Sequence, residues 1–585
     1  MINRLALFVT SLAAFFCVAP DASGATYKTP YSEPVAAADT TRTGAEWQAL
    51  GNNMRFSWAN KDVHYRHADL PSGEAVTDTA FTVWRGERVG LMAIVSAGEA
   101  TGELRPELTG LPLKGSKGAW KGSGASWMRY VLTDEYDRCG DHPDSLPAYT
   151  VPDIIDLPGA LKLDAHTSRP VWVTLEVPRD IRAGRHTADL SLVNEKGKKV
   201  ATLKMDITVA DRTLPVPSEQ AFHLNLWQQP YSVSRYYEVP RWSDRHFELL
   251  APYVQALARA GQSTISAVLF YEPWGEQSND KFDPMVETVR NADGTWSYDY
   301  TVFDRWVEFC GKNGLNGLIE CFTMIPWEMN FRYLDAPTGE YKFIKTTTDS
   351  PEYADLWGSF IKAFYAHVSE KGWADRTIIS MDERALPDML NAYRIAQEAA
   401  PGIKMALAGT YHPEVVDKVY TYSLTAGDPF PAEALKSRRD KGLISTYYTC
   451  CSSPKPNYFS NNRPSDAASI PVYCTATGAD GYLHWSFMNW TDDPMTDTRF
   501  KLFAPGDTYF YYPDNRSSVR FERLIEGVQL SEKLRMLRAE AMAAGDVATL
   551  ASLEEALLPV RTGLTSGSVT TGDVVRNLQY AVSQF

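Results

Sequence analysis

Cysteine and nucleotide-binding motifs are scarce in this 585-residue sequence, and both shortages exclude classes of protein. Seven cysteines are too few to hold a chain of this length as a disulfide framework, and their spacings match no zinc pattern. No glycine-rich loop follows the first apolar run after residue 219, which argues against a dinucleotide-binding sheet. Three histidines near predicted strand ends, His223, His412 and His484, also lack metal-ligand spacing. We therefore expect no metal and no cofactor.

Positive charge is also scarce. The chain has 58 lysines and arginines against 72 aspartates and glutamates, a formal net charge of −14. An acidic protein is repelled by nucleic acid and by anionic membrane surfaces, and no basic run is long enough to reverse this. We expect no nucleic-acid partner.

Long apolar runs are limited to residues 5–19 at the N-terminus. This run is shorter than the roughly 20 residues that a membrane-spanning helix needs. Arg4 precedes it and the small residues 22–24 follow it, which is the pattern of a cleavable signal peptide. We therefore expect residues 1–24 to be removed near Gly24–Ala25, and the mature chain to be periplasmic or secreted without a membrane span. The oligomeric state stays open.

Residues 25–215 have the pattern of β-strands. In 80–98 and 169–209, apolar and polar residues alternate, and glycines and charged turns separate the alternating stretches. This alternation is typical of strands that are buried on one face. It predicts an N-terminal antiparallel β-sandwich, and the prolines of 214–219 indicate a linker after it.

From residue 219 onward, apolar runs alternate with stretches of helical periodicity. Near-continuous apolar strands indicate a parallel sheet that is covered on its outer face. Together with a closing helix near 518–543, they predict a (β/α)₈ barrel over 219–545 and a C-terminal helical extension over 546–585. An open doubly wound sheet is the alternative. The predicted strands are 222–227, 263–270, 315–322, 377–383, 403–409, 419–424, 443–448 and 482–488.

The fourth predicted strand ends in two adjacent carboxylates, Asp382 and Glu383. Like charges side by side at the end of a buried strand are costly, and only Arg384 is next to them as a counter-charge. Catalytic groups of a (β/α)₈ barrel gather at the carboxyl ends of its strands. We therefore expect the pair to be catalytic.

Aromatic and amide side chains follow several other predicted strands. Trp and Tyr rings stack on the apolar faces of sugars, and amides bind their hydroxyls, so this composition is typical of a sugar pocket. Carboxylates also occur there, at Glu272 and Glu320, but a solvated or ion-paired role is the commoner explanation for a lone carboxylate. The predicted substrate-binding residues are Asn225, Trp274, Tyr411, Tyr447, Tyr448 and Trp485.

Adjacent carboxylates suit one form of glycoside hydrolysis in particular. The two catalytic carboxylates of most glycosidases flank the scissile bond and come from different strands. In substrate-assisted hydrolysis the 2-acetamido oxygen of the substrate attacks the anomeric carbon instead. One carboxylate then orients the acetamide and its neighbour acts as acid and base. The pair would thus hold one ionised carboxylate next to one protonated carboxylic acid.

Three segments resemble glycoside hydrolase family 123: FHLNLWQQPYSVSRYY (222–237), ISMDE (379–383) and RFERLIEGVQ (520–529). The resemblance implies an exo-acting enzyme that removes terminal non-reducing β-linked N-acetylgalactosamine, with glycosphingolipid-type glycans as substrates. It also implies substrate-assisted retaining catalysis. Asp382 would orient the acetamide and stabilise the oxazolinium ion, and Glu383 would be the general acid and base.

Two other functions stay open on the sequence alone. One is a β-N-acetylglucosaminidase or broad hexosaminidase, because the two sugars differ only at the 4-hydroxyl. The other is a non-catalytic exported glycan-binding protein, because aromatic residues and an export signal would serve it equally. Disulfide pairing also stays open among the six cysteines after the signal peptide, Cys139, Cys310, Cys321, Cys450, Cys451 and Cys474.

Overall fold

The computed structural model describes residues 32–36, 44–73, 75–115, 117–143, 145–453 and 455–585. The predicted signal peptide and its cleavage site lie outside the described residues. Among the described residues, no helix is long and apolar enough to cross a membrane.

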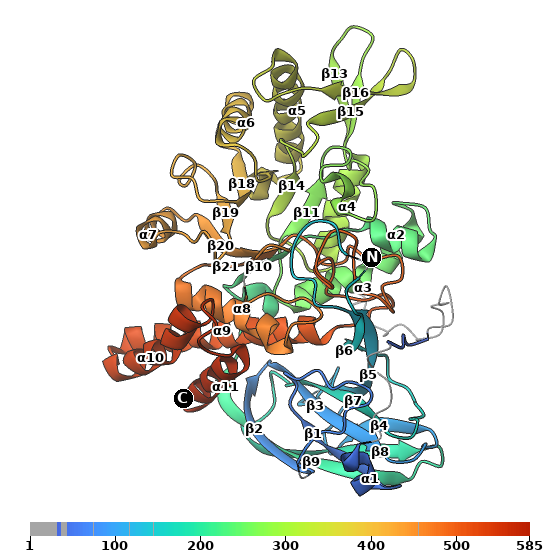
Figure 1. Cartoon of the computed structure of the whole chain (residues 1–585). Coiled ribbons are helices and arrows are strands. Elements are labelled where there is room, and N and C mark those ends of the chain that lie inside the picture. The colour runs from blue at the N-terminus through green and yellow to red at the C-terminus, as the bar shows by residue number, and fades with distance from the viewer. Residues whose placement is uncertain (1–31, 37–43, 74, 116, 144, 454) are drawn as a thin grey trace, which may run out of the picture. The chain divides into compact units, whose positions relative to one another are not determined.

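Two sheets make up the first part of the described chain (Figure 1). All neighbouring strands are antiparallel except β2 and β9, which run parallel. Buried apolar residues from both sheets form one core, so the region is the antiparallel sheet-rich domain that the alternation predicts. The first sheet has the order β1 (Met54–Ala59), β3 (Arg88–Ala97), β7 (Thr167–Glu176), β5 (Gly124–Thr133), β6 (Tyr149–Ile155), and the second β2 (Asp78–Arg85), β9 (Lys199–Thr213), β8 (Gly184–Asn194), β4 (Leu104–Thr109).

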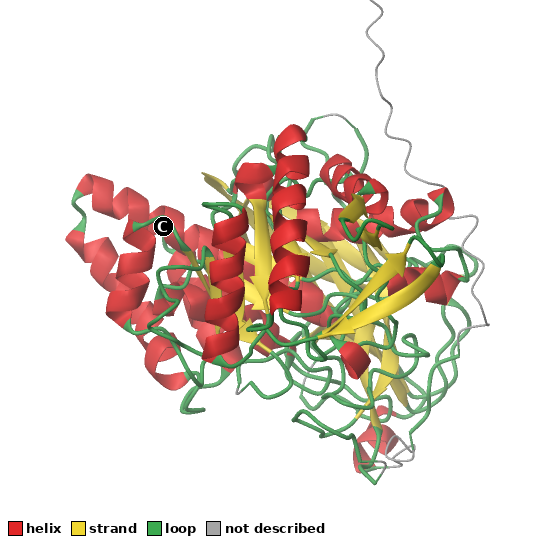
Figure 2. Cartoon of the chain, turned by 90° about the horizontal axis from the view of Figure 1, so that it is seen from above, coloured by secondary structure: helices red, strands yellow, loops and turns green. Residues whose placement is uncertain are grey.

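A single eight-stranded parallel sheet follows. Each of the eight predicted strands is present. A parallel sheet buries both faces of its strands, which is why these strands are long apolar runs in the sequence. Figure 2 shows helices flanking these strands. The strands, in their order across the sheet, are β10 (His223–Leu226), β21 (Gly481–His484), β20 (Ile444–Thr449), β19 (Thr421–Leu424), β18 (Lys404–Gly409), β17 (Thr377–Met381), β14 (Ile319–Phe322) and β11 (Ile265–Val268).

Helices follow most of these strands, but the predicted (β/α)₈ alternation fails at one connection. Residues 410–420 join β18 to β19 through turns, without a helix. Eleven residues are too few for a helix with its flanking turns, because a helical crossover needs a dozen or more. The helices that follow the other parallel strands are α2 (Tyr231–Tyr237), α3 (Asp244–Arg259), α4 (Thr301–Lys312), α5 (Pro351–Glu370), α6 (Leu386–Ala399), α7 (Ala432–Asp440), α8 (Pro464–Thr477) and α9 (Val519–Ala544).

The two edge strands, β10 and β11, are joined by side-chain amides instead of a backbone ladder. The amide of Gln262 accepts from the Leu226 N–H (2.9 Å) and donates to the carbonyls of Leu226 and Thr264 (both 3.0 Å). Gln228 accepts from the Ser266 N–H at 2.8 Å. Both glutamines are buried, so they satisfy edge groups that would otherwise lack partners. The sheet thus curls with its edges bridged.

A small four-stranded sheet is inserted after β11 and β14. Its strands were not predicted, because each spans only four to six residues and lies within a connection between parallel strands, so any alternation is too brief to identify it. They are β13 (Trp296–Asp299), β12 (Glu287–Arg290), β15 (Asn330–Asp335) and β16 (Glu340–Lys345), in sheet order.

The remaining elements are α1 (Ala45–Leu50), the 3₁₀ segments η2 (Pro217–Glu219), η3 (Gly275–Gln277) and η4 (Ala374–Arg376), and the C-terminal helices α10 (Val547–Gly563) and α11 (Thr571–Ser583). The predicted domain boundaries stay predictions.

Candidate active site

Asp382 and Glu383 follow β17 directly, and their side chains meet different surroundings. Asp382 is 7% exposed, whereas Glu383 is exposed. Successive side chains of a strand point to opposite sides, so the chain places one carboxyl inside the structure and the other at its surface. The two groups can therefore hold different protonation states although they are adjacent.

Asp382 has one oxygen bonded and one oxygen free. The Trp274 indole N–H donates to its Oδ1 at 3.3 Å, and Oδ2 is buried with no hydrogen-bond partner among the described residues. Burial raises the pKa of Asp382 to about 6, against the stabilising effect of Trp274, Thr323 and Arg384 on its ionised form. A buried carboxylate oxygen without a partner is costly, so this oxygen is poised to accept a bond from a ligand N–H or O–H.

Aromatic rings surround Asp382. Trp227, which is not among the predicted substrate-binding residues, stacks on Trp274 with ring centroids 5.6 Å apart. Phe322 at the end of β14 lies 4.4 Å from the Trp227 ring and 5.3 Å from the Trp274 ring. Tyr448 and Trp485 pack against the same cluster. The site therefore has a rigid apolar wall with a single buried carboxylate in it.

The two tyrosines at the end of β20 face opposite ways. Burial, together with the charges of Cys450, Asp507, Glu383 and Asp382, raises the pKa of Tyr448 well above its usual range. Tyr448 therefore lies close enough to sense the carboxylate pair, and its hydroxyl is protonated.

Tyr447 serves the packing of the barrel. Its hydroxyl donates to the Pro456 carbonyl at 3.1 Å, and its ring contacts those of Tyr473 and Tyr482. Tyr448 packs on the aromatic cluster around Asp382, and Tyr447 does not belong to that cluster. The reason is the two-residue period of a strand, which the pattern Tyr-Tyr alone does not orient.

Asn225 lies deeper in the curled sheet than predicted. Its amide donates to Glu320 at 2.6 Å, and the Ser380 hydroxyl donates to the same carboxyl at 3.1 Å. Burial raises the pKa of Glu320 to about 7. Ser380 and Asp382 are two residues apart on β17 and its end, so they share a face and Asn225 belongs to the layer beneath the pair.

Glu383 faces the connections that follow β18 and β19. Partial desolvation of the carboxyl and the charge of Asp428 raise the pKa of Glu383, and His412 lowers it. The Tyr411 N–H donates to Asp428 at 2.6 Å, which places Tyr411 near this side of the site. At the end of β18, Gly409 approaches so closely that an added Cβ would lie 3.1 Å from the Glu383 Cβ and Cγ. The absence of a side chain at position 409 therefore leaves room for the Glu383 side chain.

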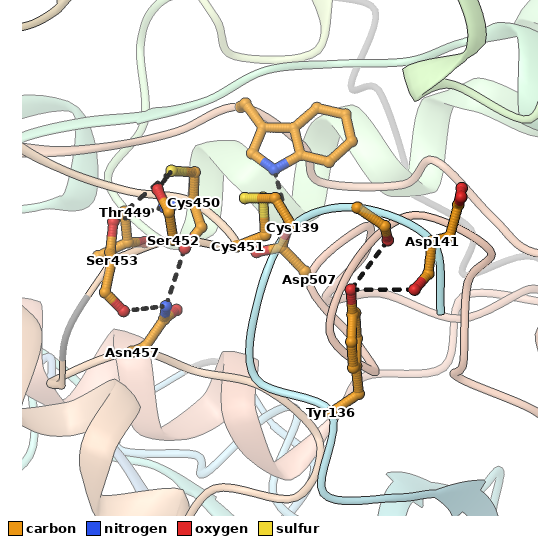
Figure 3. Close-up of a disulfide and its surroundings, with 12 residues drawn as sticks. Tyr136, Cys139, Asp141, Thr449, Cys450, Cys451, Ser452, Ser453, Asn457 and Asp507 are labelled. Atoms are coloured by element: carbon orange, nitrogen blue, oxygen red, sulfur yellow. Dashed lines mark hydrogen bonds between the residues drawn. A yellow bond between two sulfur atoms is a disulfide. The ribbon is translucent and has the colours of Figure 1, made fainter. Parts of the chain in front are cut away.

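Trp485 lies after β21 and links the aromatic wall to a disulfide. Its indole N–H donates to Asp507 at 3.0 Å, and burial raises the pKa of Asp507 to about 7. The Trp485 ring also packs on the cluster that holds Cys451. Cys451 is disulfide-bonded to Cys139, 312 residues away in the loop after β5 (Figure 3). The N-terminal domain thus reaches the loop that follows the Tyr448 strand.

The disulfide resolves a pairing that the sequence left open. Among the described residues the free cysteines are Cys310, Cys321 and Cys474, which are buried, and Cys450, which is partly exposed. These residues contain no group of three or more histidines, cysteines, aspartates or glutamates arranged to hold a metal ion.

Comparison with known families identifies the chain. A model described as the glycoside hydrolase 123 catalytic domain matches residues 227–537, and one described as the glycoside hydrolase 123 N-terminal domain matches residues 58–194. The chain belongs to glycoside hydrolase family 123. The family-123 catalytic match spans Asp382 and Glu383, the aromatic wall and the loops around them.

One solved structure shares this fold. A family 123 glycoside hydrolase from Clostridium perfringens, described in a study of glycolipid glycan hydrolysis, has a TM-score of 0.79 at 21% identity, covering 91% of this chain and 98% of its own. Two others are more remote: a Parabacteroides merdae β-glucuronidase (TM-score 0.29, 8% identity, 81% of this chain and 52% of its own) and a Thermotoga petrophila endo-β-1,4-mannanase (0.33, 8%, 54% and 78%). No curated protein matches the sequence.

Proposed function

We propose that this family 123 glycosidase removes terminal β-linked N-acetylgalactosamine from glycans by substrate-assisted catalysis. One observation carries the proposal: the buried Asp382 has an oxygen without a partner, and it is adjacent to an exposed Glu383. A 2-acetamido N–H bonded to that oxygen would satisfy it. The acetamide would then be fixed beside the carboxyl that must protonate the leaving group.

The reaction follows from these positions. Asp382 accepts a hydrogen bond from the acetamide N–H, and the acetamide oxygen attacks the anomeric carbon as the glycosidic bond breaks. Glu383 gives its proton to the leaving oxygen in the same step. The positive charge of the oxazolinium ion forms next to Asp382, which stabilises it electrostatically. Glu383, now ionised, takes a proton from water, which attacks the anomeric carbon and restores the acetamide with net retention.

The aromatic residues have defined roles in this proposal. Tyr448 is protonated beside the pair, so its hydroxyl can donate to the acetamide oxygen and aim it at the anomeric carbon. Trp227, Trp274 and Phe322 provide an apolar wall for the acetamide methyl group. Trp485 would contact the sugar ring, because it packs on the same cluster and is only partly buried. The support for a glycolipid-type glycan is family membership and the similarity to the C. perfringens enzyme.

We also propose that the protein is exported, and the Cys139–Cys451 disulfide supports this. Disulfides persist in oxidising compartments such as the periplasm and the extracellular space, and thiols predominate in the cytosol.

The decisive experiment compares nitrophenyl β-N-acetylgalactosaminide with nitrophenyl β-N-acetylglucosaminide as substrates. Wild type should prefer the galacto compound. Asp382→Asn should lose activity on it by about 100-fold or more, because the oxazolinium loses its counter-charge. Glu383→Gln should lose less on this activated leaving group than on a natural glycan, because nitrophenol needs little protonation. Glu370→Gln, an exposed carboxyl at the end of α5, is the matched control.

The outcomes separate the alternatives. Preference for the gluco compound would make the enzyme an N-acetylglucosaminidase, and equal rates a broad hexosaminidase. No turnover of either compound by wild type would favour a glycan-binding protein. Equal losses for Glu383→Gln on activated and natural substrates would contradict its assignment as the acid.

A further inference from the structure

Trp327 is a large apolar side chain that stays exposed beside the carboxylate pair. It lies in the connection between β14 and β15, and 43% of it is accessible to solvent. Its backbone N–H donates to the Pro273 carbonyl at 3.3 Å, and its own carbonyl accepts from the Arg384 guanidinium at 2.9 Å. Pro273 precedes Trp274, which binds Asp382, and Arg384 follows Glu383. The backbone of Trp327 is thus anchored to both segments that carry the site.

Arg384 also orients the ring. Its guanidinium carbon lies over the Trp327 ring, 5.0 Å from the centroid. A cation over one face of an indole holds the ring in place and covers that face. Because much of the side chain is nevertheless accessible, we take the opposite face to be open to solvent. An apolar face that is fixed in orientation can bind a flat apolar partner without losing rotamer freedom.

The proposed reaction determines which part of a substrate passes this ring. The sugar that is cleaved must place its acetamide at Asp382, inside the structure. The glycosidic oxygen must reach Glu383, which is exposed. The leaving group therefore extends outward from Glu383 to the surface of the site. Trp327 is an exposed aromatic ring at this surface, and it contacts Arg384, the residue next to Glu383.

We propose that the open face of Trp327 binds the first sugar on the leaving-group side, with Arg384 as the residue that positions the ring. The ligand is a hexopyranose whose apolar C–H face stacks on the indole, as sugar rings do on aromatic side chains. This inference rests on the proposed function. Trp327 then favours substrates in which N-acetylgalactosamine is linked to another sugar over those with a small aglycone.

The test uses two unactivated substrates that differ only in the leaving group. One is N-acetylgalactosamine β-linked to galactose, and the other is methyl β-N-acetylgalactosaminide, which offers no ring to stack. The quantity measured is the ratio of their kcat/KM values. Trp327→Ala and Trp327→Leu should lower this ratio about tenfold, as expected for the loss of one stacking contact, and Trp327→Phe should retain most of it. Tyr580→Ala, an exposed aromatic on α11, should leave the ratio unchanged.

Each outcome decides between the two proposals. If wild type hydrolyses both substrates and the Trp327 variants keep the wild-type ratio, this inference is wrong and the proposed function stands. A uniform loss on both substrates would likewise show that Trp327 does not bind the leaving group. If wild type hydrolyses neither substrate, the proposed function is wrong, and the inference about Trp327, which rests on it, is wrong as well. Trp327→Leu keeps an apolar side chain without an aromatic ring, so the ratio can be measured on this variant if Trp327→Ala does not fold.

Discussion

The contact between Gly409 and Glu383 permits a sharp test of the general acid. Gly409 ends β18, and a Cβ added there would lie 3.1 Å from both Cβ and Cγ of Glu383 and 3.4 Å from its Cα. Carbon atoms in ordinary contact are about 3.5–4.0 Å apart. Gly409→Ala must therefore displace the Glu383 side chain by roughly 0.4 Å, with no change of charge or hydrogen bonding.

The expected loss of activity follows from that displacement. A catalytic group misplaced by about 1 Å costs on the order of 100-fold, so a shift of roughly 0.4 Å should lower kcat about fivefold to tenfold. The loss should appear on natural β-N-acetylgalactosaminides, whose leaving oxygen needs a proton. It should be about twofold or less on a dinitrophenyl glycoside, which leaves unaided. The assay is steady-state kinetics on both substrates, with thermal unfolding recorded for each variant.

Stability separates a local effect from a general one. Gly409 has no positive φ, so alanine is compatible with its backbone and restricts the unfolded chain, a gain of about 0.4–1 kcal/mol. We expect the melting temperature to change little. Gly124→Ala is the control, because an added Cβ there meets nothing within 4 Å. Unchanged kcat on the natural substrate, or equal losses on both substrates, would refute the assignment of Glu383 as the acid held in this position.

Three further predictions follow from the site and its frame. Trp274→Phe removes the donor to Asp382, so the pKa of about 6 should rise and the acidic limb of kcat/KM should move to higher pH by about half a unit; an unmoved limb would mean that another group controls it. Replacing Cys139 and Cys451 together by serine should lower the free energy of unfolding by about 2–4 kcal/mol in urea titrations, and equal stability would contradict this. Gln262→Leu should cost about 3 kcal/mol in the same assay, because buried backbone groups at the β10–β11 edge lose their partners, and the conservative Gln262→Glu tests whether the amide is needed.

The strands and the position of the carboxylate pair could be predicted because they depend on local sequence. All eight parallel strands are near-continuous apolar runs, and the adjacency of Asp382 and Glu383 is covalent. A parallel sheet then forces the end of each strand to the same edge. The missing helix between β18 and β19 and the inserted sheet were not predicted. Residues 410–420 form turns, and each inserted strand spans only four to six residues, too few for a clear apolar period.

The finer features of the site depend on contacts between distant segments. Only the tertiary structure shows that Tyr448 packs on the aromatic cluster around Asp382 and that Tyr447 does not, because one residue of register reverses the two sides of a strand. The same holds for Asn225, which is drawn beneath the site by Glu320, 95 residues away.

The sequence by itself determined the class of chemistry, since residue types and their order along the chain place two carboxylates at the end of one buried strand. The tertiary structure alone decided which oxygen lacks a partner, which cysteines pair and which tryptophan faces solvent. These properties arise from packing between segments that the chain separates by tens to hundreds of residues, and no local pattern encodes that packing.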